Sequence, residues 1–358
     1  MKRVVFASGG SGGHLAPAIA LAQQSIENGV KAWIATTEKK VDQRMRESYP
    51  SLDFVGLKGI AYDGSVKSLI LFALYLAIST PMAAWFLYRN RIDQVVTTGG
   101  FGSVPVIMAA IAMGIPVFAH ESNSVPGRVT RLFAGLFSIL WYTRLFPSGE
   151  TRSKASRITG FPLRRDLSRP ERQEARKKLG FDSERKLITV FGGSQGSKRL
   201  TEFAETIGPM LVASEYQLLC VTGPANYMPE GEPPVGAKYV RFIEDMGALY
   251  SGSDLLIARS GAGSIAEIAD CGCPVVLVPL PTSADQHQLK NARAFAEAGA
   301  AILCEQEHLE DLERELILMI ENSGKLERII EAQEEWSRGN NVNDMISEIA
   351  SEMGGQRV

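Results

Sequence analysis

The chain of 358 residues is long enough for two domains that each bury a hydrophobic core. Hydrophobic residues make up 45% and charged residues 22% of it, as in ordinary soluble globular proteins, and a net charge of -2 gives no indication of a nucleic-acid partner. The charge is unevenly divided: residues 1–160 hold 17 Lys and Arg against 9 Asp and Glu, whereas residues 161–358 hold 21 against 31. Either the first half meets an anionic partner, such as a membrane surface or a phosphorylated substrate, or the two domains simply differ in surface charge.

The cysteines and the first residues indicate a compartment. Cys220, Cys271, Cys273 and Cys304 have neither C-x-x-C spacing nor a nearby His at zinc spacing, which predicts buried, reduced thiols. The apolar run in MKRVVFASGG is too short for a signal peptide and predicts a strand. We therefore expect a cytoplasmic protein.

Strands and helices alternate through the first half. Residues 4–30 predict a strand, a glycine turn and a helix, and residues 31–37 (KAWIATT) predict the next strand. The pattern recurs between residues 93 and 134. Such alternation is typical of a parallel, doubly wound sheet, whose ligands bind at the carboxyl ends of the strands.

The same order restarts after a polar, basic segment. Residues 151–165, which include GFPLRR, predict a linker, and residues 186–203 then repeat strand, glycine turn and helix. The sequence thus predicts an α/β protein of two Rossmann-like domains that face a cleft. We expect residues 1–160 to form the first domain, residues 161–340 the second, and a helix within 341–358 to pack back on the first.

Residues 68–91 depart from this pattern. They are apolar for about twenty positions, close to the length of a membrane span, with Pro81 near the middle and basic residues on both sides. A buried crossover helix, a true span and a helix at the membrane interface with exposed apolar side chains are all compatible with this. A span conflicts with flanking βα units that share one sheet. We favour the interfacial helix, because burial of a few large side chains at ~0.8 kcal/mol per CH₂, beside basic neighbours, suffices for reversible attachment.

The glycine-rich turn GGSGGH, which ends at His14, is a candidate phosphate loop. A dinucleotide fingerprint beginning at Gly10 would need glycine where Leu15 stands, and it expects an acidic residue where the second strand ends in threonines. An NAD site is therefore excluded. His14 enters the following helix beside flexible glycines, which makes it a candidate for catalysis or substrate contact.

A second glycine-rich turn lies in ARSGAGSIAE, residues 258–267. Free backbone N–H groups and the helix dipole converge at such a helix N-terminus and make an anion site. Glu267 lies one turn into the predicted helix, where a carboxylate can bridge two vicinal ribose hydroxyls. A diphosphate beside a ribose predicts a nucleotide. Ser264-x-x-Glu267 is also a capping box, so the alternative is that Glu267 only caps the helix.

Six blocks carry a resemblance to a known family: GGSGGH, HESNSVPG, GFPLR, FGGSQG, RSGAGSIAE and DQHQLKNA. They cover nearly the whole chain, which resembles the MurG family of bacterial glycosyltransferases. The resemblance implies a GT-B fold, UDP-N-acetylglucosamine (UDP-GlcNAc) as donor, inversion at the anomeric carbon, and no metal or other cofactor. The implied acceptor is lipid I, the undecaprenyl-diphosphate-linked N-acetylmuramyl-pentapeptide, which becomes lipid II in peptidoglycan synthesis.

The resemblance also implies where the protein works and with which partners. It places the protein peripherally on the anionic cytoplasmic face of the inner (plasma) membrane. Other enzymes of cell-wall synthesis are implied as further partners, in a process that serves cell shape and division.

The donor site follows from the same resemblance. It implies that the backbone of Ile243 meets the uracil, that Glu267 binds the ribose and that Gln288 holds the sugar hydroxyls. The other implied donor contacts are Ser11, Gly12, Gly13, Asn123, Arg164, Ser194 and Ser264.

The acceptor side is implied for the first domain, where His14, Phe101, His120 and Glu121 line the approach of the muramyl sugar and its diphosphate. Either His14 or Glu121 is the general base. The unperturbed pKa of a histidine, about 6.5, suits this role, and the sequence does not choose between the two. Without a metal, glycine-loop N–H groups, helix N-termini and an arginine such as Arg164 would meet the charge that grows on UDP.

Seven positions depart from the family's usual residues: Ser11, Phe101, Ser122, Thr130, Phe161, Gly263 and His287. Phe101, for example, lacks the phenolic hydroxyl of the usual Tyr. None of these departures removes a candidate base or the ribose carboxylate. Two alternatives stay open, namely a glycosyltransferase of the same fold with another lipid or natural-product acceptor, and a UDP-sugar epimerase, which needs neither a lipid acceptor nor a membrane patch.

Overall fold

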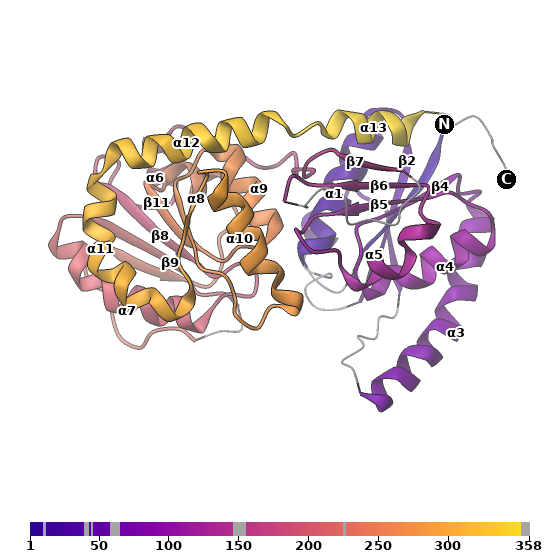
Figure 1. The fold of residues 1–358 in the computed structure, drawn as a ribbon, viewed down its shortest axis with the longest axis horizontal. Helices are drawn as coiled ribbons and strands as arrows, with labels where there is room; N and C mark the ends of the chain where they lie inside the picture. Colours follow the sequence, from indigo (N-terminus) through magenta and orange to yellow (C-terminus); the bar gives the residue numbers. More distant parts are fainter. Residues whose placement is uncertain are drawn as a thin grey trace. The chain divides into compact units, whose positions relative to one another are not determined.

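The computed structural model describes residues 1–358 apart from 10–11, 39–42, 44–45, 58–64, 146–154, 225–226 and 352–358. The chain divides into two compact units: unit 1 comprises Met1–Arg165 with Asn340–Val358, and unit 2 comprises Asp166–Gly339. Each unit has a parallel sheet with helices packed on it (Figure 1). The predicted fold class, two doubly wound α/β domains, is therefore confirmed.

In its described part, unit 1 has a seven-stranded parallel sheet in the order β3-β2-β1-β4-β5-β6-β7. The strands are β1 (Arg3–Ala7), β2 (Lys31–Thr37), β3 (Phe54–Leu57), β4 (Gln94–Thr97), β5 (Val117–Glu121), β6 (Ile139–Tyr142) and β7 (Ser156–Ile158). The helices are α1 (Gly12–Glu27), α3 (Val66–Arg89), α4 (Val104–Ala112), α5 (Arg128–Phe133) and α13 (Val342–Ala350), with short 3-10 turns η1 (Phe101–Ser103) and η2 (Ala134–Leu136). Because the strands are parallel, the turns after β1, β4 and β5 share one edge of the sheet.

Both faces of the central strands β1, β4, β5 and β6 are buried, which explains their nearly continuous apolar sequences. Successive side chains of a strand point to opposite faces. Val4 and Phe6 of β1 therefore belong to the core that includes residues of α1 and α13, whereas Val5 and Ala7 belong to the core that includes residues of α3, α4 and α5.

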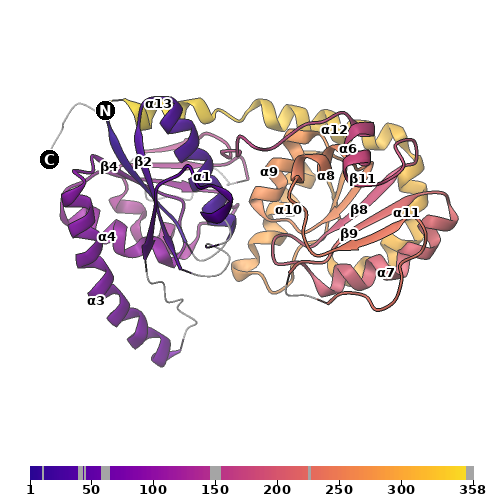
Figure 2. The same cartoon turned by 180° about the vertical axis from the view of Figure 1, so that it is seen from behind.

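The helix α13 returns late in the chain to complete unit 1. Its residues Met345, Ile346 and Ile349 are buried in the same core as α1, and Figure 2 shows α13 and α1 on one side of the sheet. Trp141 Nε1 donates a hydrogen bond to Glu348 Oε2 (2.7 Å), and Arg157 forms an ion pair with the same carboxylate (2.6 Å). Unit 1 is thus assembled from two separate stretches of sequence.

The prediction of a linker over residues 151–165 is wrong for residues 156–158, which form a strand. This strand, β7, adds to the sheet beside β6, with Ser156 opposite Leu140. The β7 residues are all exposed, so this edge strand lacks the apolar pattern that reveals a buried one. The chain passes into unit 2 after Arg165 and returns to unit 1 at Asn340.

The long helix α3 has one face in the core and one face exposed. Ser65 caps its N-terminus by accepting a hydrogen bond from Ser68 N (3.1 Å). Tyr75, Ala83 and Leu87 are buried. The opposite face exposes between 41% and 77% of each of its large apolar side chains: Ile70, Leu71, Leu74, Ile78, Met82, Trp85 and Tyr88.

The residues Ile70–Arg89 of α3 are apolar and long enough to cross a membrane, and 22% of their most apolar window is buried. A fully buried crossover helix is therefore not what the structure has. The apolar face is exposed, as expected for the interfacial helix, and its attachment to a membrane stays a prediction.

The described part of unit 2 has a six-stranded parallel sheet in the order β10-β9-β8-β11-β12-β13. The strands are β8 (Leu187–Phe191), β9 (Gln217–Val221), β10 (Ala237–Val240), β11 (Leu255–Ala258), β12 (Val275–Leu277) and β13 (Ile302–Leu303). The helices are α6 (Arg172–Lys178), α7 (Lys198–Ala213), α8 (Met246–Gly252), α9 (Ala262–Cys271), α10 (His287–Glu297), α11 (Leu309–Glu321) and α12 (Ser323–Arg338), with 3-10 turns η3 (Ala284–Gln286) and η4 (Gln306–His308).

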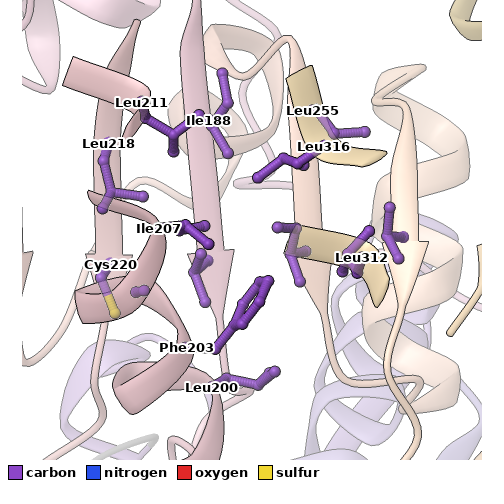
Figure 3. Close-up of a cluster of buried hydrophobic side chains, with 14 of the residues drawn as sticks. Ile188, Leu200, Phe203, Ile207, Leu211, Leu218, Cys220, Leu255, Leu312 and Leu316 are labelled. Atoms are coloured by element: carbon purple, nitrogen blue, oxygen red, sulfur yellow. The ribbon is translucent and has the colours of Figure 1, made fainter. Parts of the chain in front are cut away.

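One face of the unit 2 sheet packs against α7 and α11 (Figure 3). Ile188, Leu218 and Leu255 from the strands meet side chains such as Phe203 of α7 and Leu316 of α11. The packed sheet holds the carboxyl ends of β8, β11 and β12 side by side, and the turns that leave them carry the candidate nucleotide site.

Candidate active site

His14 is held by a two-way contact with the turn after β4. It lies in the first turn of α1, where its Nδ1 is 2.8 Å from Thr98 O, and Thr98 Oγ1 donates to His14 O (2.7 Å). A carbonyl oxygen can only accept, so Nδ1 carries the proton of the neutral ring. The contact therefore selects the tautomer in which Nε2 has the lone pair, as a general base requires.

The close approach between the turns after β1 and β4 depends on glycine in the second of these turns. A Cβ at Gly100 (φ +82) would lie 2.0 Å from Gly9 O and 3.3 Å from His14 Cδ2. A side chain at Gly100 would therefore separate the turns after β1 and β4. Phe101 follows, and its ring packs edge-on against Phe72 of α3 at 5.7 Å between centroids.

The N-terminus of α1 is the other feature of this edge. Gly12 and Gly13 are its first two residues, and their lack of side chains leaves the backbone accessible where the helix dipole favours an anion. Ser11 lies outside the described residues.

The buried carboxylate of Glu121 organises the loop that follows β5. Its Oε1 accepts from Asn123 N (3.1 Å) and Asn123 Nδ2 (3.4 Å), and its Oε2 accepts from Gly127 N (2.8 Å) and Thr130 Oγ1 (2.7 Å). These four bonds match the roughly four acceptor positions of a carboxylate. Glu121 is therefore committed to holding the loop and the start of α5, which disfavours it as a base.

His120 faces the interior of unit 1 instead of an open surface, in contrast to the expected place along the acceptor's approach. It is 2% exposed, with Nε2 2.9 Å from Gly160 O and the edge of its ring against Phe161. Burial lowers the pKa of His120, against smaller raising effects from Gly160 O and Glu121. A neutral, buried ring of this kind positions the Gly160 turn.

Arg164 lies close to the end of unit 1, in the segment that leads out of it. Its Nη1 donates to Tyr49 OH (3.0 Å), and its neighbour Arg165 pairs with Glu27 (2.6 Å). Both contacts hold this segment against unit 1.

In unit 2, the turn FGGSQGS connects β8 to α7. Ser197 is the N-cap of α7 and accepts from Leu200 N (3.3 Å). A Cβ at Gly192 would lie 2.3 Å from Ser197 N, so only glycine allows the turn to fold this tightly. Ser194 is exposed in this turn, next to a backbone suited to an anion.

Arg259, at the carboxyl end of β11, joins three of the surrounding loops. It is 6% exposed and donates to Ser197 Oγ (2.7 Å), Val278 O and Pro279 O (3.1 Å each), and Gln306 Oε1 (2.7 Å). Burial lowers the pKa of its guanidinium to about 10. These four acceptors are neutral, so the side chain contributes net positive charge behind the helix N-termini of α7 and α9.

The helix α9 begins earlier than a capping box would place it. Its N-cap is Gly261, which has no capping side chain, and Ser264 is already its third residue. The alternative in which Ser264 and Glu267 form a capping box is therefore wrong. The sequence matches a capping box, but the helix begins after Gly261, about one turn too early for Ser264 to be its N-cap.

Glu267 instead meets a tyrosine from the neighbouring helix. Tyr250 of α8 is fully buried and donates from its hydroxyl to Glu267 Oε2 (2.9 Å). Ile243 is half-buried in the segment between β10 and α8, so it leads directly into the helix that carries Tyr250.

Gln288 is tied into the same edge from α10. Its Oε1 accepts from Leu280 N (2.9 Å), and its backbone O accepts from Ser260 Oγ (2.8 Å). His287 Nδ1 contacts Ala284 O (2.8 Å) and so stabilises the start of α10. The polar cluster predicted at DQHQLKNA therefore lies against the RSG turn.

Sequence reasoning missed Arg259 and Tyr250 as parts of this site. A single arginine after a strand and a tyrosine within a short helix have no motif of their own, and only the tertiary contacts connect them to the glycine turns. Among the residues that the structure describes, no group of three or more His, Cys, Asp or Glu side chains is arranged to hold a metal.

Two parallel α/β units with glycine turns at their strand ends have the architecture of two-domain glycosyltransferases, and the family matches assign the chain to that class. The glycosyltransferase family 28 N-terminal domain matches residues 4–137, and the family's C-terminal domain matches residues 187–348.

Similar proteins narrow the class further. The UDP-N-acetylglucosamine–N-acetylmuramyl-(pentapeptide) pyrophosphoryl-undecaprenol N-acetylglucosamine transferase of Carboxydothermus hydrogenoformans is 33% identical over 351 residues, which cover 91% of this chain and 94% of that protein. The protein of the same name from Opitutus terrae is 32% identical and covers 98% of this chain. The crystal structure of Acinetobacter baumannii MurG is 26% identical, with a TM-score of 0.72 over 98% of this chain and 99% of that one. The chain belongs to this transferase family, the MurG family of glycosyltransferase family 28.

Proposed function

We propose that this protein transfers N-acetylglucosamine from UDP-GlcNAc to the 4-hydroxyl of undecaprenyl-diphosphate-linked N-acetylmuramyl-pentapeptide, with inversion, and so makes lipid II for peptidoglycan. The curated relatives are named for this transfer, and the chain covers 94% of the length of the two described above. The observation that carries the proposal is the edge of unit 2, where Arg259 lies buried behind two helix N-termini and Glu267 follows in the second turn of α9. A nucleoside diphosphate needs such an anion site beside a hydroxyl-binding carboxylate.

We assign the donor-binding residues as the resemblance to the family implies them. In unit 2, the backbone of Ile243 reads the uracil, Glu267 binds the ribose hydroxyls and Gln288 holds the sugar. The diphosphate is met by backbone N–H groups around Ser194 and Ser264, because Ser194 lies in the turn that leads into α7 and Ser264 lies in the first turn of α9. Further donor contacts are proposed for Ser11, Gly12, Gly13, Asn123 and Arg164.

His14 is the proposed general base. Its Nδ1–H bond to Thr98 O leaves Nε2 as the acceptor nitrogen, which can take the proton from the attacking hydroxyl. Glu121 receives four hydrogen bonds and shapes the loop that carries Asn123. The acceptor sugar is then proposed to meet Phe101, the loop that Glu121 holds and the Gly160 turn that His120 positions.

The departing UDP gains negative charge as its bond to the sugar breaks. Helix N-termini and the buried Arg259 offer fixed positive charge that is already oriented before the reaction, so no reorganisation is needed at that moment. These groups supply the stabilisation within the protein itself, and no metal or other cofactor is part of the proposal.

We propose further that the exposed face of α3 attaches the protein peripherally to the cytoplasmic face of the plasma membrane. Ile78, Trp85 and Tyr88 each expose more than half of their surface, and Arg89 and Arg91 are exposed beside them. Apolar side chains flanked by basic ones suit an anionic lipid surface, where a lipid-linked acceptor resides. Other cell-wall enzymes are proposed partners at the same membrane.

The deciding experiment measures UDP release from UDP-GlcNAc with and without a lipid-linked muramyl-pentapeptide analogue, and identifies the product by mass. We expect release to depend on the acceptor and the product to gain one N-acetylhexosamine. Release that ignores the acceptor would refute the transferase. Conversion of UDP-GlcNAc to an isomer would favour the epimerase, and transfer only to an unrelated lipid or natural product would favour the other glycosyltransferase alternative.

A further inference from the structure

The contact between Tyr250 and Glu267 joins two helices that leave different strands. The hydroxyl of Tyr250 is 2.9 Å from Glu267 Oε2, and Tyr250 is 1% exposed. Burial, followed by the negative charge of Glu267, raises the pKa of Tyr250 well above its usual value, so its hydroxyl keeps its proton and donates.

The helix that presents Tyr250 is fixed at both ends. Asp245 caps α8 by accepting from Ala248 N (2.9 Å) and also accepts from Ser168 Oγ (2.6 Å). At the other end, Arg176 Nε donates to Gly252 O (3.0 Å). A Cβ at Gly247 would lie 1.9 Å from Ser168 O, so the backbone of α8 is packed as closely as glycine permits. Tyr250 therefore stands on a helix that is anchored at both ends.

We propose that Tyr250 is the positioning residue for Glu267, and that this bond gives the site its preference for a ribonucleotide over a 2′-deoxyribonucleotide. The proposal rests on the proposed function, in which Glu267 receives the ribose hydroxyls. A carboxylate that is held in one rotamer meets two vicinal hydroxyls at a defined place, and it loses one of them when the 2′-hydroxyl is missing. Because Ile243 leads into α8, the same helix sets the spacing between base recognition and ribose recognition.

The test compares Tyr250→Phe with the wild type in the full-length protein by titration with UDP and with 2′-deoxy-UDP. The matched control is Tyr239→Phe, which removes a hydroxyl that donates to Ala204 O (3.2 Å) elsewhere in unit 2. We expect Tyr250→Phe to weaken UDP binding roughly tenfold, the size typical of a lost hydrogen bond to a charged group. Binding of 2′-deoxy-UDP should change much less, so the preference for UDP shrinks. In transfer assays, KM for UDP-GlcNAc should rise while kcat stays close to the wild-type value.

A double-substitution cycle separates positioning from a general loss of structure. In a Glu267→Gln background, adding Tyr250→Phe should have little further effect on UDP binding, because the residue it positions is already altered. The inference is overturned if Tyr250→Phe leaves the ratio of the affinities for UDP and 2′-deoxy-UDP at the wild-type value, whether or not both affinities fall. It is also overturned if Tyr239→Phe changes this ratio equally. Failure of the proposed function is a separate outcome, since wild-type protein would then show no acceptor-dependent transfer.

Discussion

Replacement of His14 by Asn separates the two roles that its imidazole has in the structure. The amide nitrogen of Asn can occupy the place of Nδ1 and keep the 2.8 Å hydrogen bond to Thr98 O, but Asn has no group at the place of Nε2. The variant therefore keeps the support of the turn after β4 and removes only the proposed base. His14→Ala removes both and serves as the comparison.

The expected loss follows from what the two nitrogens do. A positioned general base contributes about 10²- to 10⁴-fold in rate, equivalent to ~3–5 kcal/mol of barrier at 1.36 kcal/mol per tenfold. We expect His14→Asn to lower kcat within this range and to leave UDP affinity within about twofold of wild type. His14→Ala should lower kcat at least as much and should also destabilise unit 1 by about 1 kcal/mol through the lost hydrogen bond.

The assay is the initial rate of acceptor-dependent UDP release, with UDP affinity from titration calorimetry and stability from urea unfolding. Glu121→Gln is the rival variant, because its amide NH₂ would face one of the donors Asn123, Gly127 or Thr130. It should destabilise unit 1 by ~1–3 kcal/mol. The reasoning fails if His14→Asn retains kcat within tenfold of wild type while Glu121→Gln loses a thousandfold without loss of stability.

Three further predictions address the rest of the molecule. Arg259→Met leaves three buried acceptors and the half-buried Gln306 Oε1 without their donor, so urea unfolding should show unit 2 about 3 kcal/mol less stable. This figure allows for the gain from no longer burying a charge, and a change below about 1 kcal/mol would contradict the prediction. Burial lowers the pKa of His120 in the folded state, so below about pH 6.5 the unfolded chain binds a proton that the folded chain does not. The free energy of unfolding should therefore be highest above about pH 6.5 and fall by up to ~1.4 kcal/mol per pH unit below it. His120→Gln should flatten this slope in urea titrations between pH 7 and 5, and a slope that persists in the variant would refute the assignment. Replacement of Leu74, Ile78 and Trp85 together by serine should lower binding to anionic phospholipid vesicles more than tenfold in sedimentation assays. Thermal stability should stay unchanged, because these side chains are exposed. Unaltered vesicle binding would exclude α3 as the attachment site.

The alternation of strands, glycine turns and helices was enough to predict the fold, because strands that are buried on both faces must be continuously apolar. The strand β7 was not predicted, because an exposed strand needs no apolar sequence: Ser156, Arg157 and Ile158 lie exposed at a sheet edge. The apolar length of α3 was visible in the sequence. Which of its faces packs in the core became visible only from its contacts with the rest of unit 1.

The candidate site was predictable in part. Glycine turns mark strand ends, so the sequence placed His14 at the start of its helix and Glu267 one turn into its helix, where the structure has them. The tautomer of His14 depends on Thr98, which is 84 residues away in sequence, and no local pattern indicates such a contact. Glu121 looked as suitable a base as His14 until its four hydrogen-bond donors were known. The motif Ser264-x-x-Glu267 misled in another way, because it matches the sequence of a capping box although the N-cap of α9 is Gly261.

The position of α13 in the chain determines the order in which the two units can complete their folding during synthesis. The face of unit 1 that contains α1 is covered by Met345, Ile346 and Ile349, which leave the ribosome only after all of unit 2. Because domains fold as units while the chain emerges, the proposed nucleotide site of unit 2 can mature while the unit that carries His14 still lacks part of its core. Unit 1, whose synthesis begins first, is therefore completed last, and a chain that stops short of α13 would have the donor contacts of unit 2 beside a unit 1 with an incomplete core.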